Sequence, residues 1–175
     1  KNLAKIVQNY PNNNLLIVIS AMGKMTNKLE ELTWAYIKGD EIMHQLFDEI
    51  KAFHFEIIHT LFKDQKNPIY DEVANTFVEI EWLLEEEASD SPNYLYDQIV
   101  SIGELISTKI VAAYLNLVGV FSIWTDARNY IQTDNNYRDA NVLWDKTEQE
   151  IQKHLPSFLD KGVVVTQGFI GSTSE

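Results

Sequence analysis

Leu15-Leu-Ile-Val-Ile-Ser-Ala-Met-Gly23 is the stretch that decides the fold of this chain. Its first five residues are apolar and rich in β-branched side chains, which is typical of a strand that is buried on both faces. Small and turn-forming residues follow, and then an apolar pattern with helical spacing begins. A buried strand that turns at once into a helix predicts an α/β domain with a mainly parallel sheet, and we expect this strand to be central in the sheet.

Two more apolar segments complete the predicted sheet, at residues 118–124 and 163–170. They end in Thr125-Asp126 and in Gln167-Gly-Phe-Ile-Gly171. Helical patterns precede and separate the strands, at residues 3–7, 101–116 and 142–158. We therefore expect a parallel sheet sandwiched by helices, with a ligand site at the carboxyl ends of the strands.

The segment from about residue 40 to residue 89 predicts a long antiparallel helical hairpin inserted into this domain. Its apolar residues recur at helical spacing, and Asn67-Pro68 interrupts the pattern. Residues 67–108 contain no Lys or Arg, whereas nine acidic residues lie between Asp71 and Asp97. Such a charge run favours a solvated face and argues against phosphate binding.

The composition narrows the possible functions. The chain has 26 Asp and Glu against 14 Lys and Arg, a net charge of -12, which argues against binding nucleic acid or an anionic membrane. It has no Cys among its 175 residues, so disulfides and thiol chemistry are excluded. No apolar run approaches the roughly 20 residues of a membrane span. We expect a cytoplasmic protein with neither a nucleic-acid nor a membrane partner.

Two Glu-x-x-His sequences, Glu41-Ile-Met-His44 and Glu56-Ile-Ile-His59, match the motif of di-iron helical bundles. They lie on one uninterrupted helical pattern, fifteen residues apart. At 1.5 Å per residue that separation is roughly 22 Å, which is too long for one metal pair. We therefore expect no metal site. The sequence also lacks the common nucleophile and phosphate-binding motifs, so we assign no catalytic residue.

Ser101-Ile-Gly-Glu-Leu-Ile-Ser-Thr108 opens the central helix. Ser101 and Glu104 match a capping box, in which the serine caps the helix and the glutamate bonds back to it. Gly103 permits another group to approach the backbone closely. Glu104 also places a carboxylate in the first helical turn, and the capping box would fix its direction.

Residues from three motifs are expected to meet at one edge of the sheet. Ser20 ends the first strand, Thr26 is a candidate cap of the helix after it, and Phe169 lies in the glycine turn after the last strand. Together with Glu104, these hydroxyls and backbone amides would suit a zwitterionic amino acid. The carboxylate would pair with the ammonium, and the amides and hydroxyls would hold the ligand's carboxylates.

Four motifs in this order resemble the aspartokinases, a branch of the amino acid kinase family. The resemblance covers essentially the whole chain and rests on Val18-Ile-Ser-Ala-Met-Gly-Lys-Met-Thr-Asn27, Ser101-Ile-Gly-Glu-Leu-Ile-Ser-Thr108, Trp124-Thr-Asp-Ala-Arg128 with Ile131-Gln-Thr-Asp134, and Val164-Val-Thr-Gln-Gly-Phe-Ile-Gly171. It implies the amino acid kinase (carbamate kinase-like) fold. It also implies ATP-dependent phosphorylation of the β-carboxylate of L-aspartate to 4-phospho-L-aspartate, the entry step to lysine, threonine and methionine.

The resemblance also implies roles for individual residues. Glu104, next to Gly103, would bind the aspartate ammonium. Ser20 and Thr26 would lie at the substrate carboxylates, and the turn at Phe169 would close over the substrate.

Several parts of the family pattern are absent from these residues. They are the Lys-Phe-Gly-Gly-Thr-Ser loop, the Gly-Arg-x-Gly-Ser-Asp-Tyr-like segment, the nucleotide-binding half and the regulatory domains. We therefore expect residues 1–175 to be a partial amino acid kinase domain, inactive alone and without bound ATP or Mg²⁺. The resemblance implies a parent that binds both, forms a homo-oligomer and in some relatives is fused to homoserine dehydrogenase.

Two alternatives remain open from the sequence. One is another amino acid kinase that acts on an acidic amino acid. The other is a non-enzymatic acidic helical module that binds a partner, in which the glycine turns are purely structural.

Overall fold

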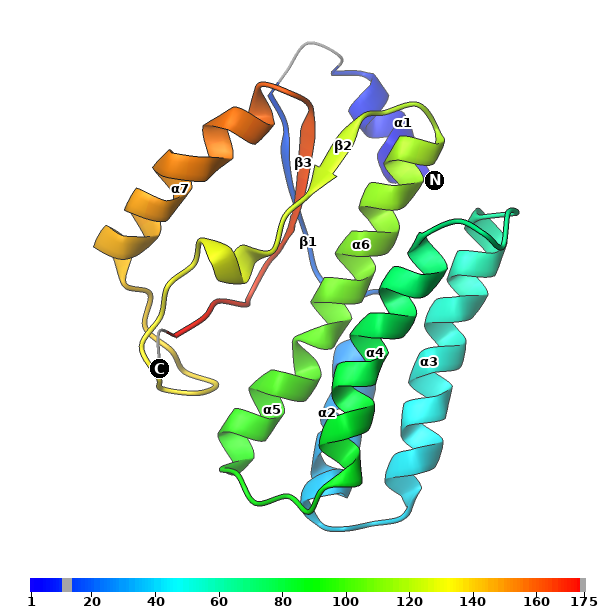
Figure 1. Ribbon diagram of the computed structural model, residues 1–175, viewed down its shortest axis with the longest axis vertical. Helices are drawn as coiled ribbons and strands as arrows, with labels where there is room; N and C mark the ends of the chain where they lie inside the picture. Colours follow the sequence, from blue (N-terminus) through cyan, green and yellow to red (C-terminus); the bar gives the residue numbers. More distant parts are fainter. Residues whose placement is uncertain (11–13, 174–175) are drawn as a thin grey trace. The chain divides into compact units, whose positions relative to one another are not determined.

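The computed structural model describes residues 1–10 and 14–173. Along the chain the elements are α1 (Asn2–Gln8), β1 (Leu16–Ile19), α2 (Met25–Ile37), α3 (Ile42–Leu61), α4 (Ile69–Glu85), α5 (Pro92–Val100), α6 (Ile102–Leu117), β2 (Ser122–Trp124), the 3₁₀ turn η1 (Ala127–Asn129), α7 (Trp144–Leu159) and β3 (Val163–Gln167) (Figure 1). Two compact units divide the described residues. Unit 1 comprises those of 1–20, 111–136 and 140–175, and unit 2 comprises 21–110 and 137–139.

Unit 1 contains a three-stranded parallel sheet in the order β1-β3-β2. This confirms the predicted α/β class with a parallel sheet. The prediction that residues 15–19 form the central strand was wrong, because β3 lies between the other two. Val164 and Val165 of β3 are fully buried, whereas Leu16 and Val18 of β1 are 44% and 58% exposed. An apolar run predicts a strand but does not tell which strand of a sheet has neighbours on both sides.

Helices cover both faces of the sheet in unit 1. On one face, Ala4 of α1 and Ala112 and Leu115 of α6 form a buried cluster with Val165 of β3. Helix α7 packs against β3 and lies on the other side of the strands from α1 and α6 (Figure 1). The predicted sandwich of a sheet between helices is therefore present.

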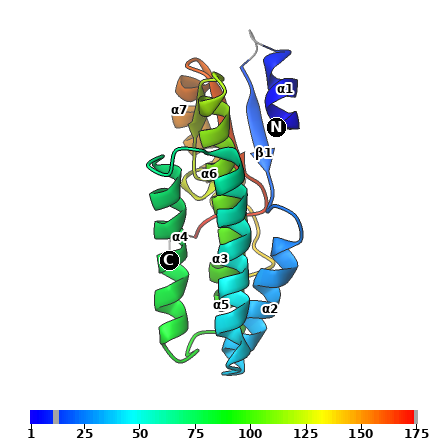
Figure 2. The same ribbon diagram turned by 90° about the vertical axis from the view of Figure 1, so that its right-hand side faces the viewer.

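Unit 2 is a bundle built from α2, α3, α4, α5 and the first half of α6, and Figure 2 shows α3 and α4 running side by side. Helices α3 and α4 form the predicted hairpin. Its interior holds residues that are at most 2% exposed, including Ile50, Ile58, Val73 and Phe77. The predicted interruption at Asn67-Pro68 is the start of α4, where the Asn67 side chain accepts a hydrogen bond from the N–H of Ile69 at 3.1 Å.

Residues 92–100 form α5, a helix that the apolar spacing of the sequence did not predict. The Ser91 hydroxyl accepts a hydrogen bond from the N–H of Tyr94 at 3.2 Å, and Pro92 occupies the first helical position. A capping serine followed by proline is a common helix start, so the sequence did carry a signal for this helix. Ser101 has helical backbone angles and connects α5 directly to α6.

Helices α5 and α6 together form one helical segment of 26 residues, Pro92–Leu117, whose most apolar window has a mean hydropathy of 1.3. By length and composition this segment is sufficient to cross a membrane, although Asp97, Glu104 and Lys109 interrupt its apolar residues. The share of its most apolar window that is buried inside the protein is 61%. Core helices of globular proteins meet the same criteria, and the burial fits that explanation.

Candidate functional site

Glu104 lies in the first turn of α6 and is only 6% exposed. Its Oε1 accepts a hydrogen bond from the backbone N–H of Ala21 at 3.3 Å. Gly103 makes this approach possible, because a Cβ at position 103 would lie 2.9 Å from both Ala21 Cβ and Leu29 Cδ1. A glycine therefore lets the turn before α2 pack against the start of α6.

The predicted capping box was wrong. Ser101 has helical angles (φ −59°, ψ −23°), and its hydroxyl donates to the carbonyl of Gln98 at 3.2 Å. Its own carbonyl accepts from the N–H of Leu105 at 3.2 Å. A capping box needs a residue outside the helix, whereas α5 runs into α6 here. The Ala21 backbone, and not a cap, holds the Glu104 side chain.

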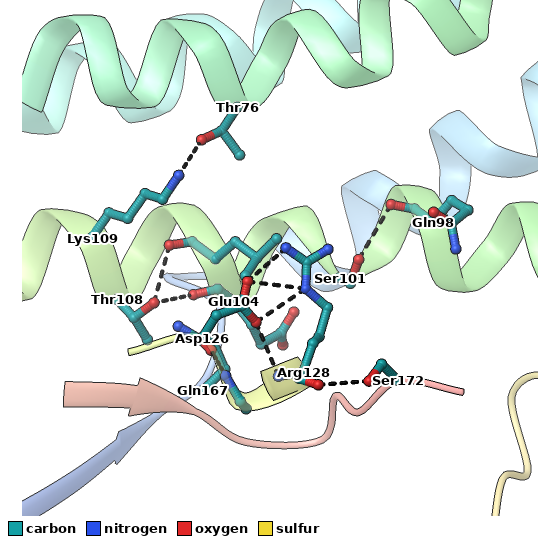
Figure 3. A network of polar contacts seen from close by, with 12 residues as sticks. Thr76, Gln98, Ser101, Glu104, Thr108, Lys109, Asp126, Arg128, Gln167 and Ser172 are labelled. Carbon is teal, nitrogen blue, oxygen red and sulfur yellow. Dashed lines mark hydrogen bonds and ion pairs between the residues drawn. The ribbon is translucent and has the colours of Figure 1, made fainter. Parts of the chain in front are cut away.

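Burial raises the pKa of the Glu104 carboxyl, and the N–H groups of Ala21 and of Glu104 itself oppose this shift. Among the residues that the structure describes, no Lys, Arg or His forms an ion pair with Glu104. The Thr108 hydroxyl donates to the Glu104 carbonyl at 2.8 Å (Figure 3). The Ser107 hydroxyl donates to the same carbonyl at 3.1 Å, so two side chains hold the backbone of Glu104. A buried carboxylate without a cation is suited to bind a ligand ammonium.

Thr26 lies within the first turn of α2 and is exposed. The prediction that it caps this helix was wrong, because Lys24 occupies the N-cap position without a side-chain hydrogen bond. Gly23 has φ +60°, and this left-handed residue allows the chain to turn into the helix two residues earlier than a cap at Thr26 would place it.

The carboxyl ends of the three strands form one edge of unit 1, because the strands are parallel. Ser20 follows β1 at this edge and is exposed. Gln167 ends β3, is 4% exposed and accepts a hydrogen bond from the N–H of Ala127 at 2.7 Å. This bond ties the turn after β2 to the end of β3.

Asp126 and Arg128 form a two-pronged ion pair directly after β2. The Arg128 Nε lies 3.0 and 3.1 Å from the two carboxylate oxygens, and Nη2 lies 2.7 Å from Oδ2 (Figure 3). The Arg128 carbonyl also accepts from the Ser172 hydroxyl at 2.5 Å. This ion pair was not predicted from the sequence, although an acidic residue and an arginine two positions apart after a strand are a usable signal.

Phe169 lies in the turn after β3 and is fully exposed, with φ +63°. A bulky residue in the left-handed region is unusual and strained. The turn is held against its neighbours, since a Cβ on Gly171 would lie 2.8 Å from Thr133 Cγ2 and 2.9 Å from the Ile131 carbonyl. The strand edge therefore presents a large apolar side chain on a packed turn.

The predicted site residues are divided between the two units. Ser20 and Phe169 belong to unit 1, at the ends of β1 and β3, whereas Thr26, Gly103 and Glu104 belong to unit 2. Within unit 2, the structure joins Gly103 and Glu104 to the turn that precedes Thr26.

Within residues 1–10 and 14–173, no group of three or more His, Cys, Asp or Glu side chains is placed to hold a metal ion. His44 and His59 of the two Glu-x-x-His sequences are exposed along α3. The described residues therefore do not fit a Mg²⁺ site, and we derive no reaction step through a metal from them.

The whole chain matches a known family. The model of the amino acid kinase family covers residues 1–175. This chain belongs to the amino acid kinase family. The parallel sheet between helices and the hairpin of α3 and α4 are thus this family member's version of the fold.

Among its relatives, this family member is 30% identical over 160 residues to lysine-sensitive aspartokinase 3 of Escherichia coli (strain K12), covering 91% of the chain and 35% of that protein. It is 31% identical over 182 residues to chloroplastic aspartokinase 1 of Arabidopsis thaliana, covering 98% of the chain and 30% of that protein. The chain thus spans about a third of the length of these relatives.

A solved structure shares the fold of this family member closely. The crystal structure of E. coli aspartokinase III in complex with aspartate and ADP has a TM-score of 0.85 and 30% sequence identity to it. The match covers 98% of the chain and 37% of the crystallised chain.

Proposed function

We propose that residues 1–175 are the aspartate-binding part of an aspartate kinase. The parent would transfer a phosphoryl group from ATP to the β-carboxylate of L-aspartate, giving 4-phospho-L-aspartate for lysine, threonine and methionine synthesis. The observation that carries the proposal is the buried Glu104 carboxylate, which has no cation among the described residues and is held by the Ala21 N–H. The likeness to an aspartokinase structure that contains aspartate and ADP supports it.

The proposal gives each predicted site residue a task. Glu104 binds the substrate ammonium, and Gly103 allows the close packing that orients it. The exposed hydroxyls of Ser20 and Thr26 bind substrate carboxylates. Phe169, fully exposed on its packed turn, covers the bound substrate and excludes water.

The chemistry of this reaction explains why no general base is needed. The aspartate β-carboxylate is already ionised near pH 7 and acts as the nucleophile without losing a proton. Catalysis then consists of positioning and of neutralising charge on the transferred group. The proposal assigns ATP and Mg²⁺ to parts of the parent other than these residues, so this chain alone should not phosphorylate aspartate.

The remaining expectations about the parent are also proposals. We propose a cytoplasmic homo-oligomer that binds neither nucleic acid nor an anionic membrane, and the acidic composition supports the last two of these expectations. Fusion to a second enzyme has a parallel among the relatives: the bifunctional aspartokinase/homoserine dehydrogenase 2 of E. coli is 25% identical over 174 residues.

Ligand titrations of the 175-residue chain, followed by NMR, test the proposal. L-Aspartate should shift signals from residues around Glu104 and Ala21, and Glu104→Gln should weaken its binding by roughly 10- to 100-fold, because the ammonium loses its charged partner. Glu79→Gln, which changes an exposed carboxylate of α4, should leave the affinity unchanged.

Succinate separates ammonium recognition from other effects, since it has the two carboxylates of aspartate and no ammonium. Glu104→Gln should leave succinate binding the same or strengthen it. An equal loss for both ligands would contradict the role of Glu104. Tighter binding of L-glutamate than of L-aspartate would indicate another amino acid kinase, and binding of neither would favour the non-enzymatic module.

A further inference from the structure

Residues 134–141 form a loop that is closed at its base by one carboxylate. Asp134 Oδ1 accepts from the N–H groups of Asn136 and Asn141 at 3.2 and 2.9 Å, and Oδ2 accepts from Asn141 Nδ2 at 2.8 Å. The Asp134 N–H donates to the Asn141 carbonyl at 3.0 Å. These hydrogen bonds lower the pKa of the Asp134 carboxyl. Hydrogen bonds of Asp134 therefore hold the two ends of the loop together.

The tip of this loop, residues 137–139, belongs to unit 2 and contacts α2 and α5 of that unit. The Arg138 N–H donates to Asp97 Oδ2 at 2.9 Å, and its guanidinium lies 4.0 Å from the ring centroid of Tyr96 and 6.0 Å from that of Trp34. The Tyr137 ring meets Tyr94 edge-on, with centroids 5.1 Å apart. The Arg138 guanidinium thus lies near two aromatic rings and a carboxylate. Cation–π interactions with the rings and the negative charge of Asp97 both attract it.

Arg138 adopts a backbone conformation that its residue type disfavours. Its φ is +68°, in the left-handed region that non-glycine residues occupy rarely. Such a conformation persists when surrounding contacts impose it. The contacts available at this residue are those to Asp97, Tyr96 and Trp34, and Arg138 itself is exposed to solvent. The tip is therefore held by a few surface contacts against a local strain.

We propose that residues 134–141 are a releasable latch, the latch loop, which docks Arg138 on Tyr96, Trp34 and Asp97 and thereby holds α5 in place. Helix α5 continues into α6 through the helical residue Ser101. Asp97 lies seven residues before Glu104 on this continuous helical path, or roughly 10 Å along it. Through its contacts with α5, Arg138 is a positioning residue for the start of α6. Release of the tip would break only these contacts.

The charges around Asp97 suit a contact that opens and closes. Burial raises the pKa of the Asp97 carboxyl, while the N–H and the positive charge of Arg138 lower it. Docking therefore gives a half-buried carboxylate its hydrogen bond and its nearby cation. Release returns both groups to water, so the two states differ by a few surface interactions and not by a change of core packing.

Hydrogen exchange of the 175-residue chain, read by mass spectrometry, tests the latch loop. Arg138→Asn removes the guanidinium and tolerates a positive φ, so it isolates the side-chain contact from backbone strain. We expect exchange in residues 134–141 and 92–100 to become roughly 3- to 10-fold faster, as for the loss of a cation–π contact and its associated charge attraction. The equilibrium constant for global unfolding in denaturant should rise by no more than the same 3- to 10-fold, since only this contact changes and no core residue does.

Tyr96→Leu supplies a second variant, and the double variant closes a cycle. The two single changes should each speed exchange in the latch loop, and the double variant should be no faster than the faster single one, because both remove the same contact. Lys153→Ala on α7, an exposed cation twelve residues beyond the end of the loop, is the matched control and should exchange as the wild type does. Wild-type exchange in Arg138→Asn, or purely additive effects in the cycle, would overturn the proposal.

Discussion

Glu104 and Asp126 are two poorly exposed carboxylates in neighbouring motifs, and the structure treats them in opposite ways. Asp126 of unit 1 has a cation of its own, since Arg128 grips both of its oxygens. Glu104 of unit 2 is more deeply buried, and its carboxylate accepts a hydrogen bond from the backbone N–H of Ala21. Asp126 is therefore paired by a neighbouring residue of unit 1, whereas no cation among the described residues pairs with Glu104.

This difference separates a structural carboxylate from a candidate binding carboxylate. Burying an ionised group without a counter-ion is unfavourable, and its raised pKa is the sign of that cost. Groups with such a shifted pKa are concentrated at functional sites, which makes Glu104 a candidate for binding a ligand cation. The same motif-level description, an acid near the end of an element, fits both residues. Only their partners distinguish them.

The largest effect is expected from breaking the packing that directs Glu104. Gly103→Val should destabilise the protein by about 3 kcal/mol, because even a Cβ would lie 2.9 Å from Ala21 Cβ. Urea unfolding measures this. Gly39→Ala is the control: its φ is +65° but open space surrounds it, so only backbone strain of about 1 kcal/mol is expected. Equal losses in both variants would show that the packing around Glu104 is not tight.

A smaller effect is expected from removing the cation of Asp126. Arg128→Ala should destabilise the protein by about 1 kcal/mol, since it leaves a mostly buried carboxylate without its ion pair while the exposed arginine limits the loss. Arg128→Lys should recover part of this lost stability, because lysine keeps the positive charge but cannot bind both carboxylate oxygens in the two-pronged geometry of arginine. Thermal unfolding of the two variants measures the difference. No loss in Arg128→Ala would mean that solvent already compensates for Asp126.

The smallest effect is a change in pH dependence at Glu104. Its folded-state pKa lies above the ordinary 4.5, so the folded state binds the proton more tightly and wild-type stability falls as pH rises from 4.5 through the folded value. Glu104→Gln removes this pH-dependent contribution to stability, because the amide oxygen still accepts the Ala21 hydrogen bond but the side chain no longer titrates.

The stability difference between wild type and Glu104→Gln should therefore be constant below pH 4.5, shift in favour of the variant above it, and become constant again. Urea unfolding at a series of pH values measures it, and Asp97, whose pKa is also raised, contributes equally to both proteins. A difference that does not vary with pH would contradict the unpaired state of Glu104.

Much of the fold could be predicted from the sequence, because periodicity reports which residues avoid water. The strands at 16–19 and 163–167 and the hairpin of α3 and α4 appear where the apolar spacing places them. Helix α5 was missed because acidic and aromatic residues obscure its apolar face, although Ser91-Pro92 marks its start. The central position of β3 was also missed, since strand order depends on contacts between segments far apart in sequence.

For the candidate site, the sequence predicted Glu104 and Gly103 as site residues, and their binding role stays a prediction. The support predicted for Glu104 was wrong: the capping box at Ser101 is not formed, because a preceding helix removes the free end that such a box needs. The partner of Glu104 is a backbone N–H, which every residue except proline carries. No sequence pattern can mark it.

The sequence by itself determined the class of this protein: an acidic, cysteine-free α/β chain with four ordered motifs of the amino acid kinase family. These properties depend on residue types and on spacing along the chain. The tertiary structure alone decided which carboxylate is paired and which is left with its charge. It also decided that Arg138 docks on α5. Burial and ion pairing are relations between distant segments, and they exist only once the chain has folded.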